Sequence, residues 1–415
     1  MIYTRKRNLL LNILHKSIGR FIYPIKLYLY WYKLPSKIKK IREKKNIKVL
    51  FIGSSLGMWK TEMLYLSMSS NPRFSPIIGI LSSTKYEYAK INYLQYLQEK
   101  KYSYVDLDQI NYQIGIINPD IIFYDSPYLS EYPRRLQFIK NLSYVFCGVD
   151  YCLNITKHKQ HLCHPWYDYC WQFYVEHDDV KRRKVELLGY RARNIKVTGV
   201  PIQDSLTQPR GVFVDPWKDK TAKKRVIYAP HHSFKGSNGE GIEFATFLEN
   251  GEAILALAEK YKDTVTFAFK PHPFLYIKLL DVWGKEKTDK YYDTWKSLPN
   301  TQFENCDYLG LFKYSDAIIH DSASFIIEYM YMDKQAMFLM SESNKLDEMF
   351  GYVRGALDCH EHGYNINDVE TFIVNVVNNN DRKKNVRSEY IKAELLPPNG
   401  KTACENIINS ILFDE

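Results

Sequence analysis

Short apolar runs alternate with longer, helix-sized segments along most of the chain, beginning at residue 47. The runs are rich in Ile, Val and Phe and contain few charges, which is typical of strands buried on both faces of a sheet. The predicted strands are 47–53, 75–81, 120–125, 143–148, 171–176, 195–201, 225–230, 264–273, 316–321 and 335–340. Strands of this kind separated by helical segments predict βαβ units and mostly parallel sheets.

One stretch, residues 205–224, interrupts this alternation. It contains two prolines, a glycine and clustered charges, which are typical of a linker. A chain of 415 residues is also longer than one ordinary core requires. We therefore predict a first α/β domain over 47–204, this linker, a second α/β domain over 225–395, and a C-terminal helix within 396–415.

The positive charge is concentrated in residues 1–46. This segment holds 13 Lys and Arg and one acidic residue, whereas the whole chain has a net charge of +10, so the remainder sums to −2. Lys16, Arg20 and Lys26 interrupt its apolar residues, which argues against a transmembrane helix, and no signal-peptide cleavage site follows. Basic residues mixed with large apolar ones, including Trp31, suit a helical arm on an anionic membrane surface. The alternative is an ordinary helix packed on the body with its lysines in water.

The near-neutral body argues against nucleic acid as a partner. The seven cysteines show no regular framework, and with no export signal they predict free thiols in the cytoplasm. His158, His161, Cys163, His164 and Cys170 have the chemistry of zinc ligands, but their spacing matches no paired Cys/His template. We therefore predict no metal site.

Polar residues that directly follow the predicted strands are the first candidates for function, because open α/β sheets bind ligands beyond the carboxyl ends of their strands. In the first domain, Gly53, Ser54 and Ser55 follow the first predicted strand, and Asp125 ends the third. Glycine allows a ligand to approach the backbone, and the spacing does not match the dinucleotide-binding fingerprint. A plain tight turn is the alternative for the glycine-serine segment.

In the second domain, two loops combine histidine with lysine. His231 and His232 follow the strand at 225–230, and Lys270 and His272 follow the next strand, with a proline on either side of His272. Histidine can donate to a phosphate and lysine supplies a point charge. These residues predict a phosphate site, with purely structural histidines as the alternative.

A third group in this domain follows the strand at 316–321. His320 and Asp321 end the strand, Ser322 and Ser324 stand where a helix begins, and Glu328 lies one turn further on. Hydroxyls at a helix start suit a pyrophosphate, and Glu328 suits ribose hydroxyls. Helix capping is the alternative, and a cap needs no ligand.

Three motifs resemble one known family. They are "KPHP" (270–273), "DYLGLFKYSDAIIHDSASFIIEYMYMDKQAMFLM" (307–340) and "VTGVPIQDSL" (197–206), of which the last also occurs in sugar-nucleotide 2-epimerases and other GT-B proteins. Together they resemble the CDP-glycerol glycerophosphotransferase family, which helps to build teichoic acids and related capsular or surface polymers. The resemblance covers roughly residues 47–411 and is sharpest over 225–345.

The resemblance implies a GT-B architecture, in which two Rossmann-like domains with parallel sheets face an interdomain cleft. It implies that the C-terminal domain holds a CDP-activated donor, the N-terminal domain holds the acceptor, and the protein is peripheral to the cytoplasmic face of the cell membrane. It also implies that His272, Ser322 and Ser324 contact the donor pyrophosphate, whereas Gly53 to Ser55 and Asp125 lie on the acceptor side.

The expected reaction is attack of an acceptor hydroxyl on the β-phosphorus of CDP-glycerol, or of a similar CDP-alditol, with release of CMP. No cofactor or metal is expected. Many family members carry a histidine taken as the catalytic base, where this chain has Cys147. Asp150, three residues further on, is the predicted base, with Asp125 and His161 as weaker candidates. His232 and His272 complete the predicted catalytic set.

Three other functions stay open at this stage. The nearest is a GT-B glycosyltransferase that uses a nucleotide-sugar for capsule or lipopolysaccharide synthesis. A sugar-nucleotide 2-epimerase has no use for a basic, aromatic arm. Cys147 in place of the histidine would also fit a non-catalytic, nucleotide-binding membrane scaffold.

Overall fold

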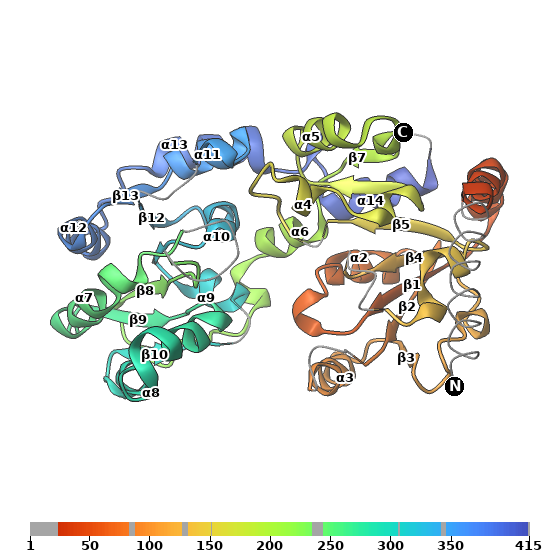
Figure 1. The fold of residues 1–415 in the computed structure, drawn as a ribbon. Helices are drawn as coiled ribbons and strands as arrows, with labels where there is room; N and C mark the ends of the chain where they lie inside the picture. The colour runs from red at the N-terminus through yellow and green to blue at the C-terminus, as the bar shows by residue number, and fades with distance from the viewer. Residues whose placement is uncertain are drawn as a thin grey trace, which may run out of the picture. The chain divides into compact units, whose positions relative to one another are not determined.

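The computed structural model divides the chain into two compact α/β units (Figure 1). The N-terminal unit contains Met1–Cys152, Lys159–Ile202 and Pro397–Glu415, and the C-terminal unit contains Leu153–His158 and Gln203–Leu396. The structure describes residues 24–82, 88–126, 132–150, 152–234, 244–305, 308–341 and 346–413.

The N-terminal unit is built on a seven-stranded parallel sheet with the order β3-β2-β1-β4-β5-β6-β7. Its strands are β1 Ile47–Gly53, β2 Phe74–Ile80, β3 Tyr104–Asp106, β4 Ile121–Tyr124, β5 Val145–Val149, β6 Cys170–Val175 and β7 Ile195–Val197. Its helices include α2 Glu62–Ser69, α3 Ala89–Glu99, α4 Lys159–Leu162, α5 Asp178–Leu188 and α14 Ala403–Leu412. Figure 1 shows α14, from the end of the chain, lying among the elements of this unit.

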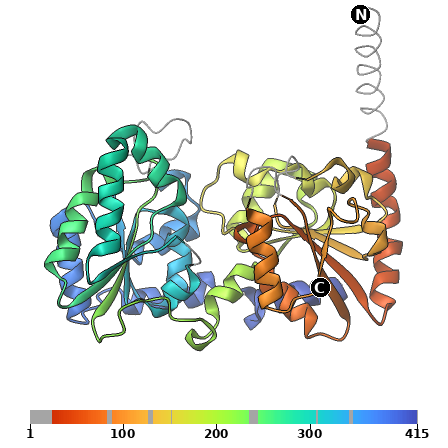
Figure 2. The same cartoon turned by 90° about the horizontal axis from the view of Figure 1, so that it is seen from below.

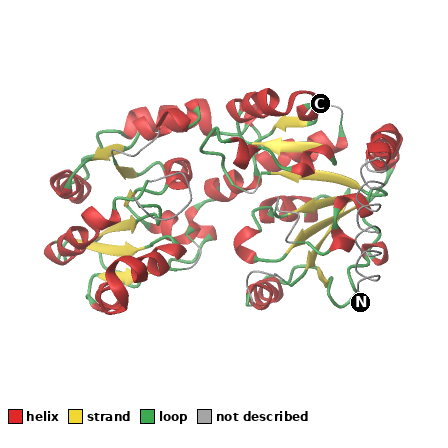
Figure 3. Cartoon of the chain, in the orientation of Figure 1, coloured by secondary structure: helices red, strands yellow, loops and turns green. Residues whose placement is uncertain are grey.

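The C-terminal unit is built on a six-stranded parallel sheet with the order β10-β9-β8-β11-β12-β13. Its strands are β8 Lys224–Ala229, β9 Val265–Phe269, β10 Thr301–Phe303, β11 Ala317–His320, β12 Gln335–Leu339 and β13 Glu361–Gly363. Its helices include α6 Pro201–Thr207, α7 Phe247–Lys260, α8 Pro273–Ser297, α9 Leu309–Tyr314, α10 Ala323–Glu328, α11 Gly351–Asp358, α12 Ile366–Val377 and α13 Lys384–Tyr390. Helices lie on both sides of the sheet (Figure 3).

The central strands are apolar throughout because both of their faces are covered. In β8, Val226 and Tyr228 pack into one core with Trp295 of α8, while Ile227 and Ala229 pack into a second core on the other face. Side chains of a strand alternate between the two faces of the sheet, so each core receives every second residue. This double burial explains the short continuous apolar runs in the sequence, and the predicted pair of parallel α/β domains is confirmed.

Each sheet has one point where the strand order reverses. In the N-terminal unit the reversal lies between β1 and β4, which pair in parallel and align Ile52 with Tyr124. In the C-terminal unit it lies between β8 and β11, which align Ala229 with His320. Open α/β sheets bind their ligands beyond the carboxyl ends of the strands at such a reversal. The residues just after these strands therefore have the positions expected of ligand-binding groups.

The predicted linker at 205–224 falls within the C-terminal unit. Trp217 is buried there, and Asp215 forms an ion pair with Arg225 at the start of β8. The chain instead passes between the units near residues 202 and 396, after a short excursion at 153–158, and the last residues return to the N-terminal unit.

Residues 24–43 of the predicted basic arm form a helix on one side of the N-terminal unit, drawn in red in Figure 2. Tyr30, Leu34, Ile38 and Ile41 are buried, at the spacing of one helical face. Trp31, which the sequence suggested as a membrane anchor, donates from Nε1 to the carbonyl oxygen of Asp168 at 2.9 Å. Residues 1–23 of the arm lie outside the described residues.

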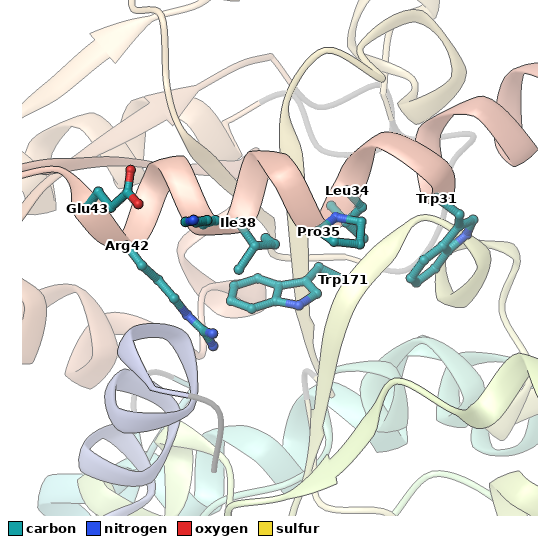
Figure 4. A pocket seen from close by; sticks show the side chains of 8 residues that line it. Trp31, Leu34, Pro35, Ile38, Arg42, Glu43 and Trp171 are labelled. Carbon is teal, nitrogen blue, oxygen red and sulfur yellow. The ribbon is translucent and has the colours of Figure 1, made fainter.

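Beside this helix lies a groove of about 610 Å³ (Figure 4). It is lined by Trp31, Leu34, Pro35, Ile38, Lys39, Arg42, Glu43 and Trp171. Arg42 points toward α14 and donates to the carbonyl oxygens of Ile411 and Phe413, at 2.9 and 2.7 Å. The helix is therefore anchored to both the sheet and the end of the chain. Across the described residues, none of the helices combines the length and hydrophobicity that a bilayer crossing requires.

Candidate active site

Three histidines meet at the carboxyl edge of the C-terminal sheet. His231 and His232 follow β8 and His272 follows β9, and their ring centroids lie between 4.0 and 4.9 Å apart. The adjacent strands bring the two loops together, and the amide of His272 donates to the carbonyl oxygen of Pro230 at 3.0 Å. The backbone amide of Lys270 likewise donates to the carbonyl oxygen of Tyr228, at 2.8 Å. We call His231, His232 and His272 the histidine cluster.

Hydrogen bonds determine where the protons of the cluster lie. Nδ1 of His272 accepts from the amide of Phe274 at 3.1 Å, and Nδ1 of His231 accepts from the amide of Ser233 at 3.3 Å. A neutral imidazole that accepts at Nδ1 carries its proton on Nε2. His231 and His272 therefore each present an N–H donor from the Nε2 side of the ring.

Burial keeps two of these rings neutral. It lowers the pKa of His231 well below 6.5, with the neighbouring His232 and His272 adding to the effect. Burial, assisted by Lys278, lowers the pKa of His232 to about 4. Both rings are therefore uncharged near neutral pH, and they can bind an anion through N–H groups rather than through net charge.

Asp321 supports the site through buried hydrogen bonds to the surrounding loops. It is fully buried at the end of β11 and accepts from the amide of His231 at 2.5 Å. Its other oxygen accepts from the amide and the hydroxyl of Thr246 at 2.6 and 3.0 Å. Burial raises the pKa of Asp321 to about 7, although these hydrogen bonds oppose the rise. Asp321 thus holds the loop after β8 in place, and its direct contact with a pyrophosphate stays a prediction.

The remaining residues predicted around the pyrophosphate differ in burial. His320 is fully buried, and its ring lies 5.3 Å from that of Phe338 and 5.4 Å from that of His360. This burial among aromatic rings disfavours a phosphate contact by His320. Ser322 and Glu328 are also buried, whereas Ser324 is half-buried at the start of the six-residue α10. Their contacts with a nucleotide stay predictions.

The histidine cluster also contains nitrogen atoms that could serve as metal ligands. Among the described residues, its ring nitrogens form the one group of three ligand atoms that lie close together, within 4.8 Å of one another. However, the rings of His232 and His272 are stacked at 4.0 Å with an interplanar angle of 10°. Nitrogen lone pairs lie in the ring plane, so two parallel rings do not converge on one ion. This geometry suits an anion that spans several donors better than a metal.

The cysteine-histidine cluster around His164 does not form such a group within the described chain. Nε2 of His164 donates to the carbonyl oxygen of His161 at 3.2 Å. Because a carbonyl oxygen is an acceptor, Nε2 of His164 must carry the proton. The six described cysteines are free thiols, as the sequence predicted.

At the carboxyl edge of the N-terminal sheet, Gly53 and Asp125 lie side by side. A Cβ atom built on Gly53 would stand 1.8 Å from Oδ2 of Asp125, so a side chain at this position would displace the carboxyl group. Ser54 and Ser55 follow and are half-buried. The four residues predicted on the acceptor side therefore share one place at the reversal between β1 and β4.

Asp150, the predicted base, is engaged in a buried ion pair. Its two oxygens lie 3.2 and 3.1 Å from Nζ of Lys184, whose side chain is 0% exposed. Lys184 also donates to the hydroxyl of Tyr167. A buried ammonium stabilises the carboxylate and competes for its lone pairs. The role of Asp150 as base stays a prediction, which this pairing disfavours.

Cys147 is buried in β5, and burial raises the pKa of its thiol to about 12. It is therefore a neutral core residue near neutral pH, and it does not replace a catalytic histidine. Neither Lys184 nor Thr246 could be recognised as a site residue from the sequence. Neither residue belongs to a motif, and a lysine in the polar pattern of α5 carries no local sign of burial.

A family model described as CDP-Glycerol:Poly(glycerophosphate) glycerophosphotransferase matches residues 168–411. This range contains the whole histidine cluster and all strands of the C-terminal sheet. No curated protein matches the chain at a significant level.

Solved structures with low sequence identity share the fold. A wall teichoic acid polymerase, TagF, is 12% identical with a TM-score of 0.56, and the match covers 93% of this chain and 96% of that chain. A UDP-GlcNAc 2-epimerase from Neisseria meningitidis, bound to UDP-GlcNAc, is 14% identical with a TM-score of 0.55, covering 89% of this chain and 100% of that chain. MnaA of S. aureus, solved with UDP, is 15% identical with a TM-score of 0.55, covering 89% and 98%. The GT-B type of fold is confirmed.

Proposed function

The chain belongs to the CDP-glycerol:poly(glycerophosphate) glycerophosphotransferase family, and we propose that its histidine cluster binds the diphosphate of the CDP-glycerol donor. The match spans more than half of the chain, so the predicted activity, that of a glycerophosphotransferase, is confirmed at the level of the family. The observation that carries the proposal is the convergence of three imidazoles at the carboxyl ends of β8 and β9, next to the strand reversal of the C-terminal sheet, with Lys270 in the loop that carries His272.

In the proposed reaction an acceptor hydroxyl attacks the β-phosphorus of CDP-glycerol. The new P–O bond forms as the bond to the bridging oxygen breaks, and CMP leaves with that electron pair. Negative charge grows on the leaving phosphate, and preorganised donors are usually the largest contribution to stabilising such charge. The Nε2 protons of His231 and His272 and the ammonium of Lys270 are the proposed donors.

We propose that the donor is bound without a metal cofactor. One fixed positive charge and several neutral N–H donors suit a diphosphate, and the parallel rings of His232 and His272 are poorly arranged for an ion. The product is proposed to be a glycerophosphate polymer of the cell surface. The family description names poly(glycerophosphate), and the fold is shared with a wall teichoic acid polymerase.

We further propose that the enzyme works at the cytoplasmic face of the membrane, attached through the helix at residues 24–43. Its outward face exposes Ile25, Tyr28, Leu29 and Tyr32, at the i, i+3, i+4, i+7 spacing of a single apolar stripe. Exposed lysines lie on the same helix, among them Lys26 and Lys33. An apolar stripe flanked by lysines is the composition of helices that lie in the interface of anionic membranes.

Replacement of His272 tests the donor site. We expect His272→Asn to lower kcat/KM for CDP-glycerol by about 100-fold, the usual loss for one donor to a developing charge. Asn retains an acceptor for the amide of Phe274 at the start of α8 but has no donor at the position of Nε2. The measurement is CMP release from CDP-glycerol with a short synthetic oligo(glycerol phosphate) as acceptor.

His362→Ala, in edge strand β13 of the same unit, is the matched control and is expected to keep the wild-type rate. The assay is repeated with CDP-ribitol and a UDP-sugar, and after treatment with EDTA. Near-wild-type turnover by His272→Asn would contradict the donor site. Turnover of the UDP-sugar alone would favour a glycosyltransferase, and loss of activity in EDTA would contradict the metal-free reaction.

A further inference from the structure

The reversal point of the N-terminal sheet has the same topology as the donor site. Gly53 ends β1 and Asp125 directly follows β4, so both stand at the carboxyl edge where the strand order reverses. In an open α/β sheet, this edge is where ligands bind. The position thus marks Asp125 as a candidate group for contact with the second substrate.

Asp125 is buried without the partners that a buried carboxyl group normally has. Its side chain belongs to a residue that is 4% exposed, and neither oxygen has a hydrogen bond of good geometry among the described residues. The hydroxyl of Thr61 lies near the carboxyl group and acts to lower its pKa, but this hydroxyl is also buried without a hydrogen bond of good geometry. Burying a polar group without a hydrogen bond is unfavourable, so a buried carboxyl group in this state calls for an explanation.

Other polar groups around Asp125 share this condition. The hydroxyl of Tyr93 and Nε1 of Trp59 are buried and lack hydrogen bonds in the described chain, and the two rings lie 5.4 Å apart. A Cβ atom on Gly53 would lie 1.8 Å from Oδ2 of Asp125 and 3.4 Å from Cε1 of Tyr93, so both side chains pack against this glycine. The buried carboxyl group therefore lies close to Tyr93, and two buried donors that lack hydrogen bonds in the described chain accompany it near this reversal point.

The other candidates for a base are less suited. Asp150 faces the buried ammonium of Lys184, and the Cys147 thiol is neutral within the core. Burial raises the pKa of Asp125 well above its usual range, with the Thr61 hydroxyl opposing the rise. A carboxylate with a raised pKa is a stronger base, and enzymes commonly adjust carboxyl groups in this direction by burial.

We propose that Asp125 is the catalytic base of the transferase, which binds the acceptor hydroxyl at the reversal point of the N-terminal sheet and removes its proton. This inference rests on the proposed function. The ionised carboxylate accepts the hydroxyl proton as the hydroxyl oxygen forms its bond to the β-phosphorus and CMP departs with the electrons of the broken bond. Asp125 then returns the proton to water or to the phosphate group of the released CMP. Tyr93 and Trp59 position the hydroxyl.

The test is Asp125→Asn in the full-length chain, with the oligo(glycerol phosphate) acceptor. Asn has nearly the same shape but does not accept a proton. We expect kcat to fall by about 10²–10⁴, the usual contribution of a general base, while the Kd for CDP-glycerol measured by calorimetry stays within about twofold of wild type. For Asp125→Gly, we expect formate to restore transfer, because the small acid replaces the missing carboxylate.

The matched control is Asp120→Asn, which changes a carboxyl group at the opposite end of β4, where Asp120 pairs with Lys44. It is expected to keep the wild-type kcat. If Asp125→Asn transfers glycerophosphate at the wild-type rate, or if formate fails to rescue the glycine variant while Asp150→Asn is inactive, Asp125 is not the base. Failure of the wild-type enzyme to bind CDP-glycerol would instead overturn the proposed function, so the two failures are distinguishable.

Discussion

At the scale of single residues, Asp321 illustrates how a buried carboxyl group shapes the donor site. It receives three hydrogen bonds from two loops, and it is the group that connects the ends of β8 and β11 with the start of α7. Burial nevertheless raises its pKa to about 7, because the charged form loses its hydration. Its protonation state therefore changes within the physiological range.

This pKa predicts a pH dependence of stability. In the unfolded chain Asp321 ionises with the ordinary pKa of 3.8, whereas in the folded protein its pKa is about 7. Between these pH values the folded protein holds a proton that the unfolded chain has lost, so the free energy of unfolding decreases as the pH rises toward 7. The loss is at most roughly 4 kcal/mol for a shift of about three units. We expect Asp321→Asn to gain stability relative to wild type as the pH rises from about 4 to about 7, in urea unfolding monitored by fluorescence.

The quantity to compare is the difference in unfolding free energy between wild type and Asp321→Asn at each pH. The buried histidines also titrate in this range, but they are present in both proteins, so their contribution cancels in the difference. Burial lowers the pKa of His232 to about 4, so its contribution is lost in the other direction, as the pH falls. Parallel stability curves for wild type and Asp321→Asn would show that folding does not raise the pKa of Asp321.

Single residues are also where the sequence was least informative. His231, His232, Lys270 and His272 could be grouped in advance, because each follows an apolar run and parallel strands end at a common edge. The environment of Asp150 could not, because Lys184 lies 34 positions away and reaches it only through the fold. The same applies to His320, whose motif suggested a ligand but whose ring is enclosed by Phe338 and His360.

At the scale of elements, the helix at residues 24–43 has two different apolar faces. One is buried through Tyr30, Leu34, Ile38 and Ile41, and the other exposes Ile25, Tyr28, Leu29 and Tyr32, of which Tyr32 is 74% exposed. A helix that only covers a core needs one apolar stripe. The second stripe is therefore the feature that supports a membrane surface as partner.

Replacing the outer stripe tests this partner. We expect the triple variant Tyr28→Ser, Leu29→Ser, Tyr32→Ser to bind vesicles of phosphatidylglycerol at least about tenfold more weakly than wild type in a sedimentation assay. Each large apolar side chain withdrawn from water contributes about 1.5–3 kcal/mol when fully buried, and three partly buried ones exceed a tenfold effect. Binding is also expected to weaken with salt, since lysines contribute attraction that salt screens.

The control is a double variant on α3, Tyr88→Ser with Ile91→Ser, which removes two exposed apolar side chains elsewhere on the same unit. It is expected to bind vesicles as wild type does. Equal binding by wild type and the helix variant would exclude the outer stripe as the contact with lipid.

The strands also show which parts of the fold the apolar pattern of the sequence predicts. The ten predicted strands match observed ones within a few residues, whereas β3, β10 and β13 were missed. These three strands have three residues each and lie at or next to the sheet edges, where one side is uncovered. Short edge strands need no long apolar run, so they leave little periodic signal.

At the scale of the whole molecule, the chain ends in the unit where it began. Asn406 of α14 donates to the carbonyl oxygen of Thr198, and Ser410 exchanges hydrogen bonds with Gln172 of β6 at 3.0 and 3.2 Å. Ile407 and Ile411 are fully buried against the same unit. The N-terminal unit is therefore complete only when the last residues of the chain are in place.

Deleting residues 401–415 tests this dependence. We expect the truncation to destabilise the N-terminal unit by several kcal/mol, because two large buried side chains and the buried partners of Gln172 are lost together. Hydrogen exchange should show faster exchange in β6 and β7. The amides of β8 and β9 in the C-terminal unit are the internal control and are expected to keep their protection. Unchanged exchange in β6 and β7 would contradict a structural role for α14.

Local apolar patterning and short motifs at strand ends were enough to predict the two parallel α/β units, the positions of their central strands and the family. Only the folded chain shows the order of the strands, which places His231 beside His272 at the ends of the neighbouring β8 and β9, and Gly53 beside Asp125 at the reversal between β1 and β4. It also decided which carboxyl groups are paired and which are not, since Asp150 and Asp125 look alike in the sequence. The reason is physical: burial and hydrogen-bond partners come from segments far apart in the chain, and they set the chemistry of a side chain.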